Sequence, residues 1–359
     1  MMRKYAVAIL GATGAVGQRL ISELEKSKIP VKQIKLLASK RSAGKKLKFK
    51  NQEIIVEEAQ PDSFKGVDLV LSSAGGAVSK RLLPEAVKRG AVCVDNTSAF
   101  RMADEVPLIV PGVNDEQLVN HHGIIANPNC STIQMVAALY PLHVKWGIKQ
   151  IIVSTYQAVS GAGKAAWDEL LQQAQDRLNK QKTTAKILPT ASAKKHYPMA
   201  FNLLPQIDVF EDDGYTHEEW KMIHETKKIL FNDQDSKKIK VTATCVRVPV
   251  EIGHGETVYF VLKDEKATTA GIKREIVKTP GLVLQDDPEN QIYPQPLLAA
   301  GKKETFVGRI RSDQENPGAF NMWIVADNLL RGAASNTVEI AECLVRDNLV
   351  RVSKQQIAL

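Results

Sequence analysis

Residues 5–17 read YAVAILGATGAVG, an apolar run followed by a glycine-rich turn. The run Tyr5–Leu10 is apolar throughout, as in a parallel strand that is buried on both faces. Gly11, Gly14 and Gly17 follow with G-x-x-G-x-x-G spacing. Glycines at such a turn let the backbone approach a pyrophosphate closely, at the N-terminus of the next helix. The stretch therefore predicts a dinucleotide site at the start of a Rossmann-type domain.

Strands and helices alternate through the first third of the chain. Ile34–Ala38, Val67–Ser72 and Ala91–Asp95 are further short apolar runs, and Lys80–Arg89 has a helical pattern. This alternation predicts an α/β fold with a doubly wound parallel sheet.

The pattern changes after a helix that begins near Ser131. Longer strands with alternating polar residues predict a mixed sheet with one exposed face, at Gln150–Thr155, Lys240–Val250, Thr257–Leu262 and Phe320–Ala326. Further helices are expected at Lys164–Asn179, His217–Leu230 and Ser335–Asn348. We therefore expect a dinucleotide-binding domain over 1–132 and a second, α+β domain over 133–329. A C-terminal helical segment, about 330–359, should pack back on the first domain.

Size and composition are typical of a cytoplasmic α/β enzyme. The 359 residues contain 6% aromatics and four cysteines that are far apart, with no C-x-x-C pair or zinc-binding histidine pattern. This argues against disulfides and metal and for a reducing compartment. No apolar run approaches the roughly 18 residues that span a bilayer. The net charge is +8, but the lysines at 45–50 have no interleaved aromatics, so we expect a solvated surface and not a nucleic-acid site.

Cys130 is the candidate nucleophile. It lies in NPNCST at 127–132, directly before the apolar, helix-like stretch 133–139. At a helix N-terminus the unpaired N–H groups and the helix dipole favour a thiolate. The alternative is a buried, inert cysteine.

The end of the second predicted strand distinguishes between the two nicotinamide cofactors. An NAD site usually has Asp or Glu there to bind the ribose hydroxyls. This chain has Ser39, Lys40 and Arg41 and no acid at that point. A hydroxyl and two cations suit a 2′-phosphate, so NADP is the expected cofactor.

His254 is the candidate base. It follows a predicted strand, and Gly253 and Gly255 should leave its ring unshielded. With a pKa near neutrality, such a histidine can accept and return a proton.

Three cations are candidates for holding an anionic substrate. Arg101 lies just past the carboxyl end of a strand, where open α/β sheets bind ligands. Arg247 stands in a strand-like run, and Lys221 follows Glu218 by three residues on a predicted helix. Each alone is more typical of a solvated charge or salt bridge. Together with a nucleophile they suit a substrate with carboxylate and phosphate groups.

Seven segments together resemble the aspartate-β-semialdehyde dehydrogenase family in its bacterial form. They are GATGAVG at 11–17, DNTSAFR at 95–101, NPNCST at 127–132, TYQAVSGAG at 155–163, AFNLLPQID at 200–208, EEWK at 218–221 and RVPVEIGHGE at 247–256. The resemblance runs from Gly11 to the C-terminal helix. It implies reversible, NADP- and phosphate-dependent conversion of L-aspartate 4-semialdehyde to L-4-aspartyl phosphate, used reductively in lysine, threonine, methionine and diaminopimelate synthesis.

The resemblance also implies roles for individual residues and a homodimer, with 133–329 as the catalytic and dimerisation domain. Cys130 would be the nucleophile, His254 the general acid/base, and Gln157 would orient the substrate. Arg247 would bind the substrate carboxylate and Arg101 and Lys221 the phosphate, with Asn129 and Glu218 completing the substrate site. The implied cofactor residues are Gly11, Ala12, Thr13, Gly14, Ala15, Val16, Ser39, Lys40, Arg41, Ser160, Gly161 and Asn328.

Two alternatives remain open on the sequence. The first is a reductase of another acyl phosphate, such as N-acetylglutamyl phosphate, with the same cysteine and histidine chemistry. The second is a non-catalytic dinucleotide sensor, although such a protein should have lost the cysteine, the histidine or the phosphate-binding cations.

Overall fold

The computed structural model describes residues 3–231 and 238–351, and it divides into two compact units. The first unit comprises residues 1–129 and 333–359, and the second comprises residues 130–332. Residues 352–359, at the end of the expected C-terminal segment, lie outside the described part of the chain.

The first unit contains a mostly parallel sheet of order β3-β4-β2-β1-β5-β6-β7. Only β3, at the edge, is antiparallel to its neighbour in the described sheet. The strands are β1 (Tyr5–Leu10), β2 (Val31–Ala38), β3 (Lys46–Phe49), β4 (Gln52–Glu58), β5 (Leu69–Ser72), β6 (Val92–Asp95) and β7 (Ile124–Ala126). The helices are α1 (Ala15–Lys26), α2 (Gly76–Lys88) and α9 (Ser335–Arg346).

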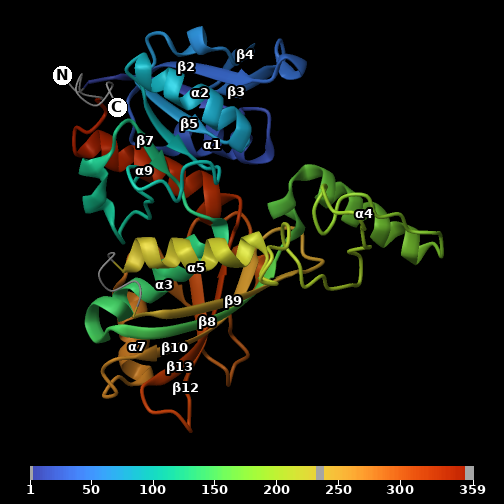
Figure 1. Cartoon of the computed structure of the whole chain (residues 1–359), viewed down its shortest axis with the longest axis vertical. Helices are drawn as coiled ribbons and strands as arrows, with labels where there is room; N and C mark the ends of the chain where they lie inside the picture. The colour runs from blue at the N-terminus through green and yellow to red at the C-terminus, as the bar shows by residue number, and fades with distance from the viewer. Residues whose placement is uncertain (1–2, 232–237, 352–359) are drawn as a thin grey trace. The chain divides into compact units, whose positions relative to one another are not determined.

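Helices cover both faces of this sheet because the side chains of β1 alternate between two cores. Val7 and Ile9 pack in one core with residues of α1 and α9. Ala8 and Leu10 pack in the other core with residues of α2. Figure 1 shows α9, which comes from the end of the chain, beside the strands of this unit. The predicted doubly wound sheet is therefore confirmed.

The second unit contains a mixed sheet of order β11-β12-β13-β10-β8-β9. Its strands are β8 (Ile148–Gln157), β9 (Lys240–Arg247), β10 (His254–Leu262), β11 (Leu282–Leu284), β12 (Thr305–Ser312) and β13 (Ala319–Ala326). Its helices are α3 (Cys130–Trp146), α4 (Lys164–Leu178), α5 (His217–Leu230), α7 (Thr269–Lys278) and α8 (Pro296–Ala299). The mixed sheet is confirmed, whereas β11, β12, α7 and α8 were not expected from the sequence.

One face of the mixed sheet positions the polar side chains considered below. Thr155 and Gln157 alternate with exposed residues along β8, so both lie on its buried face. Helices α3 and α5 lie over β8 and β9 on this side (Figure 1). Helix α4 instead forms a separate small core with residues of the segment after it, including Leu188 and Met199.

No helix in the described residues is long and apolar enough to cross a membrane.

Candidate active site

The second unit brings Cys130 and His254 together. Cys130 is the first residue of α3 and is half-buried, while His254 is the first residue of β10 and is fully buried. The Cys130 Sγ and His254 Nε2 atoms are 3.2 Å apart. A sulfur at the positive end of a helix dipole, in contact with an imidazole nitrogen, has the surroundings of a reactive cysteine.

The expectation that the glycines leave the ring of His254 unshielded is wrong. His254 opens a strand and its exposed fraction is 0%. Gly253 adopts a φ of +98°, which favours glycine, and a β-carbon there would press on Pro296. A β-carbon on Gly255 would overlap the ring of Trp323. The two glycines therefore serve the backbone path and close packing, not access to the ring.

A backbone contact determines which nitrogen of His254 carries the proton. The N–H of Ala158 donates to Nδ1 of His254 over 3.0 Å. Since Nδ1 accepts this bond, the proton of the neutral ring is on Nε2, the atom that faces the Cys130 sulfur. The neutral ring can therefore donate a hydrogen bond to a thiolate.

The expectation of a pKa near neutrality for His254 is also wrong. Burial, and then the positive charge of Arg247, lower the pKa of His254 to about 3. Protonation would add a second buried cation beside Arg247, and it would turn the Nδ1 acceptor into a donor facing the N–H of Ala158. The ring is consequently neutral at physiological pH.

Arg247 ends β9 inside the same site. Its side chain is buried, and one Nη1–H donates to the carbonyl of Ala158 over 2.8 Å. Within residues 3–231 and 238–351, the buried Nε–H of Arg247 has no hydrogen-bond acceptor. Burial lowers the pKa of this guanidinium, and Glu218 opposes the shift. A buried guanidinium with an unused donor is suited to binding an anion.

Gln157, Glu218 and Lys221 form a continuous hydrogen-bonded chain. The Gln157 amide nitrogen donates to Glu218 over 3.1 Å, and its oxygen accepts from Thr155 over 3.0 Å. Lys221 pairs with Glu218 at 3.3 Å and with Asp208 at 2.8 Å. The sequence therefore selected three residues that do interact, but not Thr155 and Asp208, which hold the two ends of the chain.

Ser160, Gly161 and Asn328 lie next to the paired cysteine and histidine in the second unit. Asn328 donates to the Ser160 hydroxyl over 3.0 Å and accepts from the N–H of Gly253 over 2.9 Å. A β-carbon on Gly161 would lie 3.1 Å from Arg247 and 3.4 Å from the ring of His254. All three residues thus position the backbone around His254, whatever else they bind.

Arg101 and Asn129 belong to the first unit. Arg101 is buried, and its guanidinium donates to the carbonyls of Asn127 and Asn96 over 2.9 and 3.0 Å. Asn129 is buried and immediately precedes Cys130. Their roles at a substrate stay predictions.

A cavity of about 360 Å³ lies at the carboxyl ends of β1, β2, β4 and β5, beside the glycine turn. Gly11, Thr13, Gly14, Ser39 and Lys40 line it, as expected for cofactor residues, while Arg41 is not among its lining residues. Helix α1 begins here with Gly14 as its N-cap and no capping side chain, so its first N–H groups can bind an anion.

Two charged residues of this cavity were not identified from the sequence. Arg81 of α2 adds a cation, and Glu58 adds an acid at the end of β4. Neither belongs to the glycine motif or to the end of the second strand, so only the folded sheet brings them to the cavity. The residues present fit a phosphorylated dinucleotide.

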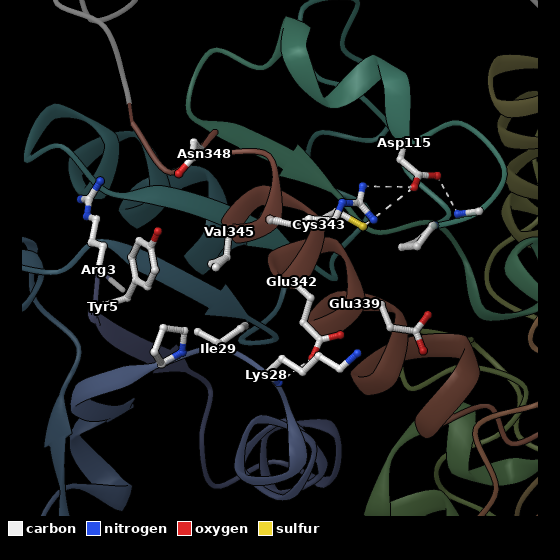
Figure 2. A pocket seen from close by; sticks show the side chains of 14 residues that line it. Arg3, Tyr5, Lys28, Ile29, Asp115, Glu339, Glu342, Cys343, Val345 and Asn348 are labelled. Atoms are coloured by element: carbon white, nitrogen blue, oxygen red, sulfur yellow. Dashed lines mark hydrogen bonds and ion pairs between the residues drawn. The ribbon is translucent and has the colours of Figure 1, made fainter. Parts of the chain in front are cut away.

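The first unit has a second cavity, of about 980 Å³, at the opposite end of β1. Figure 2 shows Tyr5 and side chains of α9, including Cys343 and Glu342, around it. Burial and then Asp115 raise the pKa of Cys343 to about 11, so this sulfur is a thiol. The residues that line this cavity include no cysteine–histidine pair like Cys130 and His254.

Comparisons with known proteins assign the family. The profile of the semialdehyde dehydrogenase NAD-binding domain matches residues 6–121, and that of the semialdehyde dehydrogenase dimerisation domain matches residues 139–331. The aspartate-semialdehyde dehydrogenase of Bacillus subtilis is 54% identical over 350 residues, 98% of this chain and 100% of that protein. The chain belongs to the aspartate-semialdehyde dehydrogenase family. The resemblance found in the sequence is thereby confirmed.

Solved structures agree with this assignment to the aspartate-semialdehyde dehydrogenase family. Aspartate semialdehyde dehydrogenase II from Vibrio cholerae, complexed with ASA, matches with a TM-score of 0.89 and 42% identity, over 96% of this chain and 99% of that one. The Candida albicans enzyme with NADP matches with a TM-score of 0.72 and 29% identity, over 97% of this chain and 100% of that one.

The low pKa of His254 predicts a pH dependence of stability. Between pH 6.5 and about 3 the unfolded chain binds a proton at this residue that the folded protein excludes. The free energy of unfolding therefore decreases on acidification through this range, by up to ~1.4 kcal/mol per pH unit from this residue. Denaturant titrations at several pH values should show a shallower decrease for His254→Gln. The exposed His122→Gln should keep the wild-type slope, and equal slopes for both variants would contradict the buried neutral ring.

Gly332 predicts a second effect on the site. It lies in the π-helical segment Leu330–Ala334, and a β-carbon there would come within 2.6 Å of the Cys130 β-carbon. Gly332→Ala must therefore displace Cys130, and we expect kcat to fall on the order of tenfold with a loss of about 1–3 kcal/mol in stability. Steady-state kinetics and thermal melts measure both. Gly76→Ala is the control, because its methyl would meet its nearest neighbour at 3.9 Å; an unchanged kcat in Gly332→Ala would refute the steric argument.

Proposed function

We propose that this protein catalyses the NADP- and phosphate-dependent interconversion of L-aspartate 4-semialdehyde and L-4-aspartyl phosphate, through a thioester on Cys130. The main support is the 3.2 Å contact between Cys130 Sγ and His254 Nε2, beside the buried guanidinium of Arg247. Family membership supports the substrate, since a relative of this fold was solved in complex with ASA.

In the oxidative direction, the Cys130 sulfur forms a bond to the aldehyde carbon while the carbonyl oxygen takes up the electron pair of the C=O bond. The Nε2–H of His254 donates a hydrogen bond to the sulfur and then to this oxygen. The oxygen's electron pair re-forms the C=O bond as hydride leaves the carbon. Bound NADP⁺ would supply the acceptor for that hydride. The product of these steps is a thioester.

A phosphate oxygen then attacks the thioester carbonyl, and the S–C bond breaks to return the thiolate of Cys130. Arg247 binds the substrate carboxylate, which also offsets the positive charge that lowers the pKa of His254. Because Nε2 carries the proton of the neutral ring, His254 would act first as the acid at this atom and then as the base that takes the proton back. Gln157, Glu218 and Asn129 orient the substrate, and Arg101 and Lys221 hold the phosphate.

The first unit would bind NADP through the turn Gly11–Val16 and the cavity beside it. Ser39, Lys40 and Arg81 line this cavity and favour a 2′-phosphate over a bare ribose, and Arg41 follows Lys40 directly in the chain. Ser160, Gly161 and Asn328 would contribute from the second unit. Under this assignment residues 1–132, with the C-terminal segment from about 330, form the NADP domain, and residues 133–329 form the catalytic and dimerisation domain.

The second unit would also form a homodimer. Residues 139–331 match a dimerisation domain. Ile152 and Tyr156 are exposed on the face of β8 opposite to Gln157, and apolar side chains on a sheet face can be covered by a second copy. In a bacterial cytoplasm the enzyme would run reductively, towards lysine, threonine, methionine and diaminopimelate.

The reaction is tested by following reduction of NADP⁺ with aspartate semialdehyde, with and without phosphate, beside the N-acetylglutamate semialdehyde analogue. We expect phosphate-dependent turnover of the aspartate compound alone. Cys130→Ser should lower kcat on the order of 10³-fold or more while NADP binding persists. Cys343→Ser, at a buried cysteine of the first unit, is the matched control. Turnover of the analogue alone would change the substrate, and no turnover of either would support the sensor alternative.

Cofactor choice is tested separately. Lys40→Ala/Arg41→Ala removes two cations from the expected 2′-phosphate site, so KM for NADP should rise on the order of tenfold or more with little change for NAD. Lys46→Ala/Lys48→Ala removes the same charge from exposed positions of β3 and should leave the preference intact. An unaltered NADP-to-NAD ratio in the first double variant would place recognition elsewhere.

A further inference from the structure

Glu256 is a buried acid that the proposed mechanism does not use. It follows His254 by two residues on β10, so both side chains lie on the same face of the sheet. Its exposed fraction is 0%, and within the described residues neither of its carboxyl oxygens has a hydrogen-bond partner. Burial raises the pKa of Glu256 well above its usual value, and the side chain of Gln134 opposes the shift. Glu256 is therefore a neutral acid that carries an O–H donor.

Gln134 on α3 has a buried acceptor that could meet this O–H donor. It stands one turn after Cys130 on α3, so both side chains lie on one side of that helix. Its amide nitrogen donates to the carbonyl of His254 over 3.2 Å. Its amide oxygen is buried and, like the oxygens of Glu256, has no hydrogen-bond partner in the described chain. A buried acceptor of this kind carries its full desolvation penalty unless a donor meets it.

Helix α3 thus contacts His254 twice. Cys130 meets the ring at Nε2, and Gln134 meets the backbone carbonyl of the same residue. Of the residues opposite Glu256 in the sheet, Ile324 is apolar and the Thr155 hydroxyl directs its proton to Gln157. Neither forms a hydrogen bond with the Glu256 carboxyl in the described residues.

We propose that Glu256 is a positioning residue for the reactive pair, because its neutral carboxyl donates to the Gln134 amide oxygen and so fixes α3 against β10. The bond orients the Gln134 amide, whose nitrogen then holds the carbonyl of His254. The distance from Cys130 Sγ to His254 Nε2 depends on this link. The catalytic importance of this positioning role rests on the proposed function. The link between Glu256 and Gln134 itself depends only on contacts within the second unit.

The test measures the alkylation rate of Cys130 by iodoacetamide as a function of pH, with the modified residue identified by mass spectrometry. Glu256→Gln retains a neutral donor of the same shape, and we expect a rate within about twofold of wild type. Glu256→Leu removes the donor, so the thiolate loses part of its support from Nε2–H. We expect alkylation at pH 7 to slow about three- to tenfold and its pH midpoint to rise.

The helix side of the pair gives an independent variant. Gln134→Met removes the acceptor and should slow alkylation to a similar extent, which also serves if Glu256→Leu does not fold. The double variant should be no slower than the slower of the two single variants, since both act on one link. Val258→Ala, on the same face of β10, is the control for a general loss of stability: its melting temperature should fall while alkylation is unchanged.

Two results would overturn the proposal. If Glu256→Gln is as slow as Glu256→Leu, an ionised carboxylate is required. If Glu256→Leu melts earlier but alkylates at the wild-type rate, its role is structural. Turnover of the aldehyde gives a second readout, in which kcat should fall with KM unchanged. Alkylation of the wild-type protein does not require that this aldehyde be the substrate, so failure of the proposed function and failure of the positioning role are distinguishable.

Discussion

The hydrogen bond from the Ala158 N–H to Nδ1 of His254 is the constraint on which the site depends. It fixes the tautomer of the ring, and so places the remaining proton between Nε2 and the Cys130 sulfur. The carbonyl of the same alanine accepts from Arg247. One residue after β8, with no functional side chain, therefore orients both the imidazole and the guanidinium. The sheet contributes to chemistry by holding this backbone at the ends of β8, β9 and β10.

The charges of the site follow from this arrangement. Arg247 is buried with an unused donor, and a protonated His254 beside it would be a second buried cation. The fold keeps the ring neutral, and the acids Glu218 and Asp208 face both Lys221 and Arg247. What the site offers a ligand is therefore the buried Nε–H donor of Arg247 and not a net positive charge. A charged donor of this kind is suited to an anionic acceptor. An anion on Arg247 also offsets the second cause of the low pKa of His254, after burial, so ligand binding and the protonation of the ring are coupled.

Much of the fold could be predicted because its signals are local. The apolar run and glycine turn at 5–17 identify the first unit, and a polar turn before an apolar helix identifies Cys130. The sequence also selected Gln157, Glu218 and Arg247, which the structure brings to one site. It could not reveal the contacts of the Ala158 backbone, the β-carbon space at Gly332 or the arrival of Arg81 at the cofactor cavity. Each of these depends on segments that are distant in sequence. The exposure and pKa of His254 were predicted wrongly for the same reason, since Ala158 and Arg247 reach its ring only in the folded sheet.

The four cysteines show why position, and not residue type, decides reactivity. Burial raises the pKa of Cys93 and of Cys245, and it raises that of Cys343 to about 11, so these three remain thiols. Acidic groups near each of them act in the same direction. Cys130 differs in all respects: it is half-buried, begins a seventeen-residue helix and faces an N–H donor. A buried apolar site disfavours a thiolate, which needs nearby donors or positive charge. Among these four positions, only the junction of α3 with β10 provides such stabilisation. A nucleophile at that junction is a property of the fold that two segments 124 residues apart build together.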